Sequence, residues 1–276
     1  KTASGKSWTM GNQLTFSGSG ELDNGMNVSL SFVIDQNDDS TKSTAAQLDN
    51  APFDSHSVTV SSDAMGTLKF SGEGGSSAQA AIDTTAAGDL WDNGSGFDTP
   101  KSSEGGNNSF IYTVPSLMDD LTLQGSYSPG SAGGPSATAF RVGFTGVEGL
   151  SVDFAEGQIE TVGSEADVTT IKGSYAISSF TLSASSTEYD AASSDETVDS
   201  YNIAYTVSDD LSIAYGTETI ETQGQTVDEE ADKFNVSYTT GGVTLSATQY
   251  NFEGSGNIAG AAGEKERWSL SATFAF

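Results

Sequence analysis

The sequence lacks cysteine and has only one histidine, and these two shortages exclude most catalytic chemistry. Zero Cys excludes disulfide scaffolds, thiolate metal centres and Cys nucleophiles. The single histidine, His56, lies between Ser55 and Ser57, and neighbouring residues of a strand point to opposite faces. A Ser-His hydrolase also needs a positioned acid and an oxyanion hole, for which the sequence offers no pattern. We therefore predict that the protein is not an enzyme.

Long apolar runs and basic residues are scarce as well. No stretch approaches 18 apolar residues, so no transmembrane helix is predicted. No basic and apolar leader is recognisable, as expected of an exported chain that has lost its signal. Ten Lys and Arg stand against 38 Asp and Glu, which gives a net charge of −28. Such a charge repels nucleic acid and attracts cations, so nucleic acid is excluded as a partner.

The pattern that is present is alternation of apolar and polar residues over segments of about ten residues, the length of a tilted strand that crosses a bilayer. In residues 26–35, for example, one face carries Val28, Leu30, Phe32 and Ile34. The hydrophobic fraction of 35% is low for a soluble core but suits strands with one face in water. Fourteen Phe and nine Tyr argue against disorder. The pattern predicts an all-β protein.

Fifteen segments alternate in this way. They lie near residues 13–22, 26–35, 54–63, 66–73, 107–114, 119–127, 137–146, 149–159, 166–176, 179–188, 197–207, 210–219, 231–240, 242–252 and 265–276. Bacterial single-chain barrels normally have an even number of strands. We therefore predict one domain over residues 1–276, a transmembrane antiparallel up-and-down β-barrel with 16 strands when intact, whose extra strand lies in residues 1–10 or is missing from this chain.

The connections between these segments alternate in length. Tight turns such as Gly146–Gly149 and Thr240–Gly242 follow some strands, and longer polar stretches such as Glu160–Ala166 and Glu253–Glu264 follow others. Short turns at one end and long loops at the other are typical of an outer-membrane barrel.

The longest connection, residues 74–107, has no strand alternation, and an unstructured segment of this length is usually functional or disordered. Its small-residue run Ser76–Ile82 could form a short helix. Folded into the barrel, the segment would form an acidic constriction that favours cations. The alternative, a solvated external loop, stays open. The candidate constriction acids are Asp83, Asp89, Asp92, Asp98 and Glu104.

Basic residues within the strands lie opposite the apolar faces. A charged side chain facing lipid at mid-membrane costs about 2–4 kcal/mol, so these bases are expected to point into the pore. They either create a transverse field with the acidic loop or compensate nearby wall carboxylates. Lys172 is ambiguous because its strand alternates poorly. The predicted pore-wall bases are Lys69, Arg141, Lys233 and Arg267.

The C-terminal segment carries a more specific pattern. One face of residues 267–276 presents apolar side chains at alternate positions and ends on an aromatic residue: Trp268, Leu270, Phe274 and Phe276. This arrangement resembles the signal that barrel-insertion machinery reads in Gram-negative porins.

Two further segments resemble general porins of Gram-negative bacteria, and the alphaproteobacterial, marine members are the most similar. One is Phe16–Gly25, which resembles their early hairpin, and the other is Gly66–Gly72 followed by the long connection, where these porins carry their constriction loop. The opening strand of the family is not recognisable. The resemblance implies a homotrimer whose third loop narrows the pore.

Together these features predict an outer-membrane porin: a passive diffusion channel for small hydrophilic solutes and ions that prefers cations, in contact with outer-membrane lipid and lipopolysaccharide. No cofactor is expected, although acidic clusters such as Asp35, Asp38 and Asp39 or the pair Glu229 and Glu230 could bind Ca²⁺. Solvated charge is the simpler interpretation of those clusters. Two alternatives stay open: a secreted or surface-anchored β-rich structural protein such as an adhesin, and a substrate-selective channel.

Overall fold

The computed structural model describes residues 14–34, 53–103, 107–130 and 134–274. Fifteen β-strands and three short 3-10 helices form this part of the chain. The strands are β1 (Leu14–Glu21), β2 (Asn27–Ile34), β3 (Phe53–Ser62), β4 (Gly66–Glu73), β5 (Ser109–Thr113), β6 (Leu121–Ser128), β7 (Ser136–Val147), β8 (Leu150–Thr161), β9 (Ser164–Ile177), β10 (Phe180–Ala191), β11 (Glu196–Ser208), β12 (Leu211–Thr222), β13 (Glu229–Thr240), β14 (Val243–Glu253) and β15 (Lys265–Phe274). The helices are η1 (Ala80–Ile82), η2 (Leu90–Asn93) and η3 (Gly260–Ala262).

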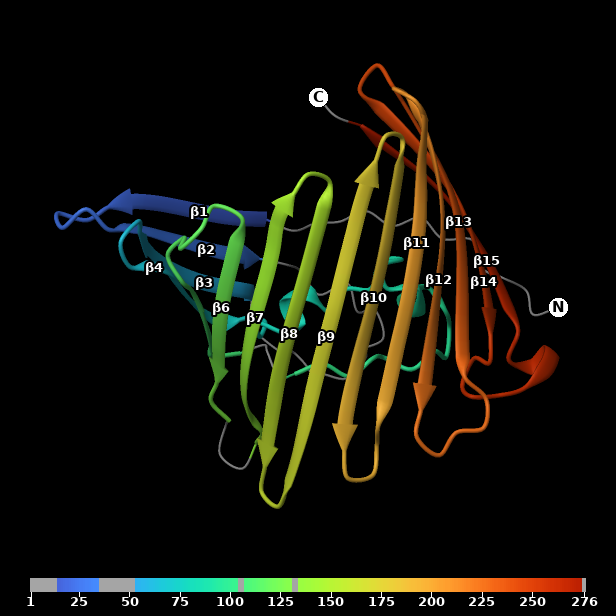
Figure 1. Cartoon of the computed structure of the whole chain (residues 1–276), viewed down its shortest axis with the longest axis horizontal. Coiled ribbons are helices and arrows are strands. Elements are labelled where there is room, and N and C mark those ends of the chain that lie inside the picture. The colour runs from blue at the N-terminus through green and yellow to red at the C-terminus, as the bar shows by residue number, and fades with distance from the viewer. Residues whose placement is uncertain (1–13, 35–52, 104–106, 131–133, 275–276) are drawn as a thin grey trace, which may run out of the picture.

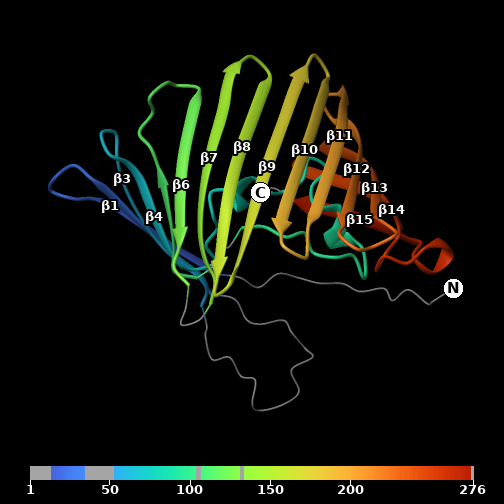
Figure 2. The same ribbon diagram turned by 60° about the horizontal axis from the view of Figure 1, so that its bottom comes forward.

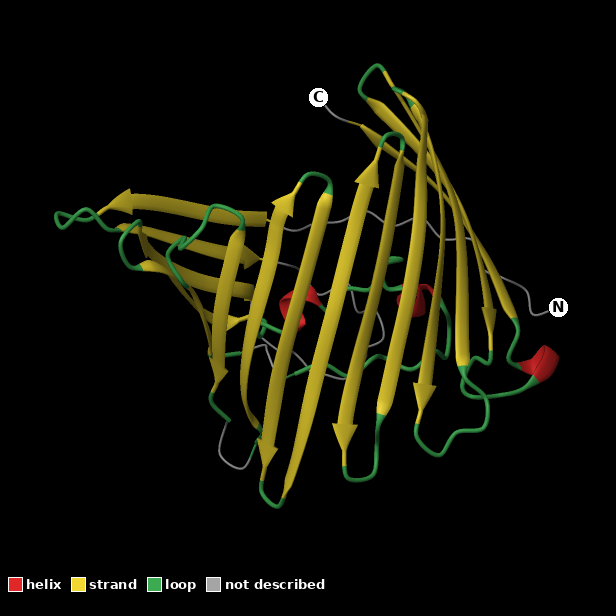
Figure 3. Ribbon diagram, in the orientation of Figure 1, coloured by secondary structure: helices red, strands yellow, loops and turns green. Residues whose placement is uncertain are grey.

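The strands form one sheet in chain order, and each pairs antiparallel with the strand before and the strand after it. The sheet curves around an interior (Figures 1 and 3). The predicted all-β, antiparallel up-and-down fold is confirmed. Among the described residues β1 and β15 are the two edges and are not paired with each other. Residues 1–10, where the sixteenth strand was expected, lie outside the described part.

Alternation along the strands separates two faces of the sheet. Four residues that are paired from β10 to β13, namely Leu182, Ile203, Tyr215 and Phe234, are 46%, 42%, 47% and 47% exposed on the convex face. Residues of the opposite parity, such as Ser200, are buried. The bulky apolar side chains thus point outward, away from the buried interior. Such a surface is suited to contact with lipid.

One predicted long connection is wrong. Residues 160–166 do not form a loop, because Glu160 pairs with Glu165 and Thr161 with Ser164. The turn consists of Val162 and Gly163 alone, and Gly163 has a φ of +88°. The second position of this turn therefore has a positive φ, which glycine adopts without strain.

The connection between β4 and β5 lies on the concave side of the sheet, which Figure 2 shows between the strands. Most of the fully buried side chains of the protein lie where this segment meets β8–β14. The predicted helix at Ser76–Ile82 is limited to the three-residue turn η1. In the described part of the chain, helices are too short or too polar to cross a membrane.

Candidate functional site

The first half of the long loop (residues 74–107) follows a single cross-strand row of the concave wall. We name this set the first row, and cross-strand pairing joins its seven members from β9 to β15: Lys172, Ser185, Ser200, Glu218, Ala231, Phe252 and Lys265. Loop residues 84–95 contact this row in almost the same order as they occur in the chain. The loop therefore runs across the strands.

Backbone N–H groups of the loop donate to side chains of the first row. The amide of Ala86 donates to Ser185 Oγ at 2.8 Å and that of Ala87 to Ser200 Oγ at 2.9 Å. Glu218 accepts two bonds, from the amides of Leu90 at 3.3 Å and Trp91 at 3.2 Å. Because Glu218 is only 2% exposed, its carboxylate depends on these donors in place of water. It is the acceptor that holds the start of η2.

Loop carbonyls are bound by the basic side chains of the wall. Lys172 donates to the carbonyl of Thr84 and Lys233 to that of Ala87. Further along the loop, the carbonyls of Asn93 and Ser95 accept bonds from Arg267 and Lys265. These four bases therefore hold the loop in position.

An apolar cluster joins η2 to the wall. Leu90 is fully buried against Phe252 and Ala231, with Ala87 beside it. The ring of Phe97 meets Phe252 edge-on at a centroid distance of 5.2 Å. Burying a leucine side chain in this way stabilises the contact by about 2 kcal/mol. Polar and apolar contacts thus hold the same segment.

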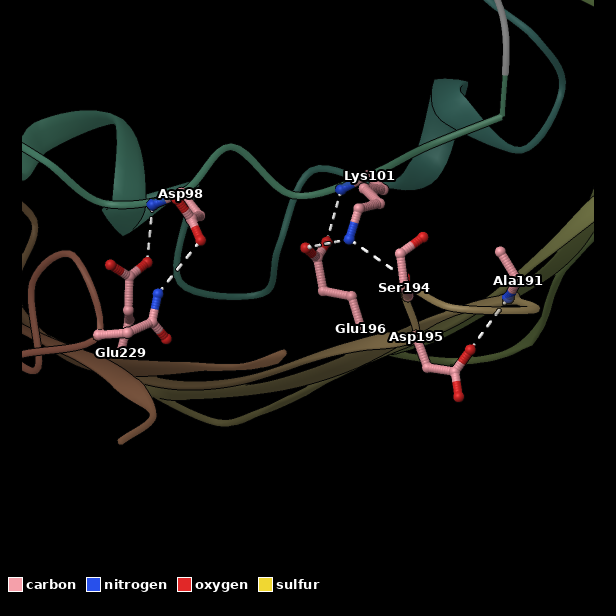
Figure 4. Close-up of polar contacts among 8 residues, drawn as sticks. Asp98, Lys101, Ala191, Ser194, Asp195, Glu196 and Glu229 are labelled. Atoms are coloured by element: carbon pink, nitrogen blue, oxygen red, sulfur yellow. Dashed lines mark hydrogen bonds and ion pairs between the residues drawn. The ribbon is translucent and has the colours of Figure 1, made fainter. Parts of the chain in front are cut away.

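The returning half of the loop lies closer than the outgoing half to the ends of the strands at which β11 begins. We name Ala139, Gly157, Val168, Tyr189 and Glu196 the third row, again joined by cross-strand pairing. Lys101 forms a salt bridge of 3.1 Å with Glu196 and also donates to the carbonyl of Ser194 (Figure 4). The backbone amide of Lys101 donates to the same carboxylate at 2.6 Å.

Between these two rows lies a second row, formed by Ala155, Thr170, Thr187, Val198, Ile220 and Glu229. Glu229 accepts the amide of Asp98 at 2.7 Å where the loop turns back (Figure 4). Gln79, at the base of the loop, donates to Thr170 at 2.8 Å.

Two wall glycines permit the close approach of the loop. A Cβ atom on Gly216 would lie 2.8 Å from Cβ of Ala87, and one on Gly157 would lie 2.5 Å from Cβ of Ser103. Side chains at either position would push one arm of the loop away from the wall.

The predicted constriction acids all lie on the loop but differ in their surroundings. Asp92 and Asp98 are exposed, and Oδ2 of Asp98 accepts a bond from Asn257. Asp89 is half-buried and accepts the amide of Thr85 at 2.9 Å. Glu104 lies outside the described residues. A role in constriction stays a prediction for all of them.

Asp83 is the acid whose charge is most affected by its position. Desolvation by burial, together with the charge of Asp89, raises the pKa of its carboxyl from 3.8 to about 6, although Ser102 and Lys172 act in the opposite direction. This group therefore titrates close to neutral pH.

The predicted pore-wall bases also differ. Lys233 and Arg267 bind loop carbonyls, as described above. Arg141 donates to Asp153 at 2.7 and 2.9 Å and to Gln124 at 3.1 Å, which is charge compensation within the wall. Lys69 pairs across the strands with Thr59 and is exposed.

The structure also shows where the residues of the predicted assembly signal and of a predicted calcium pair lie. Trp268, Leu270 and Phe274 of the assembly signal are 67%, 82% and 64% exposed, and Phe276 lies outside the described residues. Glu229 and Glu230 are consecutive residues of β13, and Glu229 accepts the amides of Asp98 and Gly256, so calcium binding by this pair stays a prediction. The described residues contain no cluster of three acids or histidines suited to a metal ion.

Sequence reasoning did not predict that the loop is bound by the wall carboxylates Glu196, Glu218 and Glu229 and the bases Lys172 and Lys265. A usable signal existed for Glu218, since it lies on the polar face of its strand with no base next to it in the sequence. A carboxylate in such a place needs donors, and the loop supplies them.

Comparison with known proteins gives one family and several similar structures. A family model described as Gram-negative porin matches residues 1–210. Curated protein sequences provide no match.

Three of the similar structures illustrate the range. A loop L8 deletion mutant of the outer membrane protein OmpT of Vibrio cholerae has 15% identity and a TM-score of 0.66, over 98% of this chain and 93% of that one. OmpF of Salmonella typhi, in complex with daunomycin, has 10% identity and a TM-score of 0.67 over 94% and 88%. An anion-selective porin from Comamonas acidovorans has 13% identity and a TM-score of 0.64 over 90% and 80%. At these identities the similarity concerns the fold.

Proposed function

Since the chain belongs to the Gram-negative porin family and is therefore an outer-membrane channel, we propose that it is a passive diffusion pore for small hydrophilic solutes that prefers cations. The observation that carries the cation preference is that basic side chains of the concave wall and the loop are bound to carbonyls or carboxylates, whereas loop carboxylates are exposed. Lys172, Lys233, Lys265 and Arg267 donate to loop carbonyls, and Lys101 and Arg141 are paired with carboxylates. Carboxylates neutralise Lys101 and Arg141, while the other four bases keep their charge but are fixed at the wall by the loop carbonyls that they bind.

The exposed charges of the loop are carboxylates. Asp92 and Asp98 are exposed, and neither forms a salt bridge. A unit charge about 8 Å from a passing ion contributes about 0.5 kcal/mol in a water-like dielectric, which is roughly a twofold change in local cation concentration. Because the two factors multiply, two such charges favour cations by a factor of about four before screening by salt lowers it.

The test is the reversal potential of the protein in a planar bilayer under a KCl gradient. We expect wild-type protein to pass K⁺ in preference to Cl⁻, and the double variant Asp92→Asn, Asp98→Asn to lower the permeability ratio about two- to fourfold. Glu188→Gln is the matched control, because it removes an acid from the exposed face of β10. Equal permeability of the two ions in wild-type protein would remove the cation preference and leave the channel.

The assembly and the surroundings of the pore belong to the same proposal. OmpT of Vibrio cholerae, with 16% identity, has been solved in a trimer form, and we propose that this chain forms homotrimers as well. The exposed apolar rows of the convex face contact outer-membrane lipid. Transport of this kind needs no catalysis or cofactor, and contact with lipopolysaccharide and Ca²⁺ binding by the acidic loops stay predictions.

A further inference from the structure

The two arms of the long loop enclose a cavity against the wall. The outgoing arm bonds to Ser200 and the returning arm to Glu196, four residues apart on β11, which is about 13 Å at the rise of a strand. Thr187 and Val198 of the second row lie between them and form the floor of the cavity. Its volume is about 210 Å³, room for a molecule much larger than water.

The two sides of this cavity differ in charge. Asp83, Thr85, Asp89 and Trp91 line the side formed by the outgoing arm, and Thr99, Pro100, Lys101 and Ser102 line the other. The ammonium group of Lys101 is already held by Glu196 and by the carbonyl of Ser194. Because Lys101 is paired with Glu196, its positive charge does not neutralise Asp83 and Asp89. The cavity therefore keeps an excess of negative charge.

Among the described residues, neither carboxylate is in a salt bridge. Asp89 accepts the amide of Thr85, and Asp83 is bonded to Ser102, yet burial and the charge of Asp89 together raise the pKa of Asp83 to about 6. A cation placed in the cavity would stabilise the charged form. The indole of Trp91 offers an aromatic face, which attracts cations and packs against an alkyl chain.

We propose that this cavity is a binding site for small organic ammonium solutes, with the ammonium group on Asp83 and Asp89 and the alkyl part against Trp91 and Val198. The proposal rests on the proposed channel function, because the site is reached from the interior of the pore. Solutes of this class pause at the loop, so their passage saturates and they interrupt the flow of K⁺ while bound.

The experiment uses n-butylammonium chloride as the probe and records K⁺ current through single channels of the full chain in planar bilayers. Wild-type protein is expected to show interruptions of the current that saturate with probe concentration. Asp83→Asn keeps the shape of the side chain and should raise the half-saturating concentration at least about tenfold, the loss expected of a charge-assisted hydrogen bond. n-Butanol, which lacks the charge, should cause no interruptions.

The matched control is Glu188→Gln, which removes the same charge from an exposed position of β10 that does not line the cavity. Its half-saturating concentration should stay within about twofold of wild type. An equal loss in both variants, or no saturable interruption in wild-type protein, would overturn the site. Absence of any K⁺ current in wild-type protein would instead overturn the channel itself, so the two failures are distinguishable.

Discussion

Asp83 links the shape of the loop to pH through one carboxyl group. Its pKa lies near 6 because burial removes water from it and because Asp89 lies close by, while Ser102 and Lys172 only partly offset these effects. A raised carboxyl pKa means that the neutral form suits the folded loop better. The stability from this group is therefore complete below about pH 4 and is lost as pH rises through 6.

The cation preference should follow the charge of Asp83. As pH falls from 7.5 to 5, Asp83 becomes protonated, the loop loses a negative charge and the ratio of K⁺ to Cl⁻ permeability should fall by about twofold. Reversal potentials at the two pH values measure this change. Asp83→Asn should remove most of the pH dependence, and a variant that titrates in parallel with wild type would contradict the assignment.

The long loop is an element whose position depends on contacts with β6 and with β8–β15. Glu218 is central, since it is buried, accepts the amides of Leu90 and Trp91 and lies beside the apolar contact of Leu90 with Phe252. Removal of this acceptor leaves two loop amides without their partner. A buried amide without a partner costs about 1–3 kcal/mol.

Glu218→Ala should therefore release the segment around η2 from the wall. The expected result is single-channel current with more frequent transitions between conductance levels, because the loop then occupies more than one position. Glu218→Gln, which keeps one acceptor oxygen, should lie between the variant and wild type. Glu221→Ala changes an exposed acid of the same strand and serves as the control; current as steady in Glu218→Ala as in the control would argue against the anchoring role.

At the scale of the whole molecule, apolar side chains lie on the outside of the sheet and many polar side chains are buried inside, the opposite of a soluble protein. Large apolar side chains such as Leu270 and Trp268 are 82% and 67% exposed, whereas the interior contacts with the loop include many buried polar and charged groups. Exposed apolar surface of this extent needs a lipid or detergent layer.

The purified protein should accordingly be monodisperse in detergent and aggregate when the detergent is removed. Light scattering after size exclusion, with the detergent contribution subtracted, should give three times the mass of one chain for the proposed homotrimer. A monodisperse species without detergent would contradict the membrane fold, whereas a single-chain mass in detergent would contradict only the trimer.

The local sequence determined the strands and their two faces. Alternation has a period of two, so the side on which Arg141, Lys233 or Arg267 lies can be read from neighbours within a few residues. The length of the segment after β4 likewise predicted that it is either functional or disordered, and residues 74–103 lie ordered against the wall. The two-residue turn at Val162 and Gly163 was not predicted, because the ends of β8 and β9 on either side of it are polar on both faces and therefore resemble a loop.

Only the tertiary structure decided which wall residues meet the loop. Glu218 and Leu90 are 128 positions apart, and their contact depends on the register of every strand pair from β4 to β12. A one-residue slip in any pair would place a different side chain under the loop, and no local pattern records that register. The pKa of Asp83 and the cavity beside it follow from the same packing, since burial and charge proximity exist only once the loop lies on the wall.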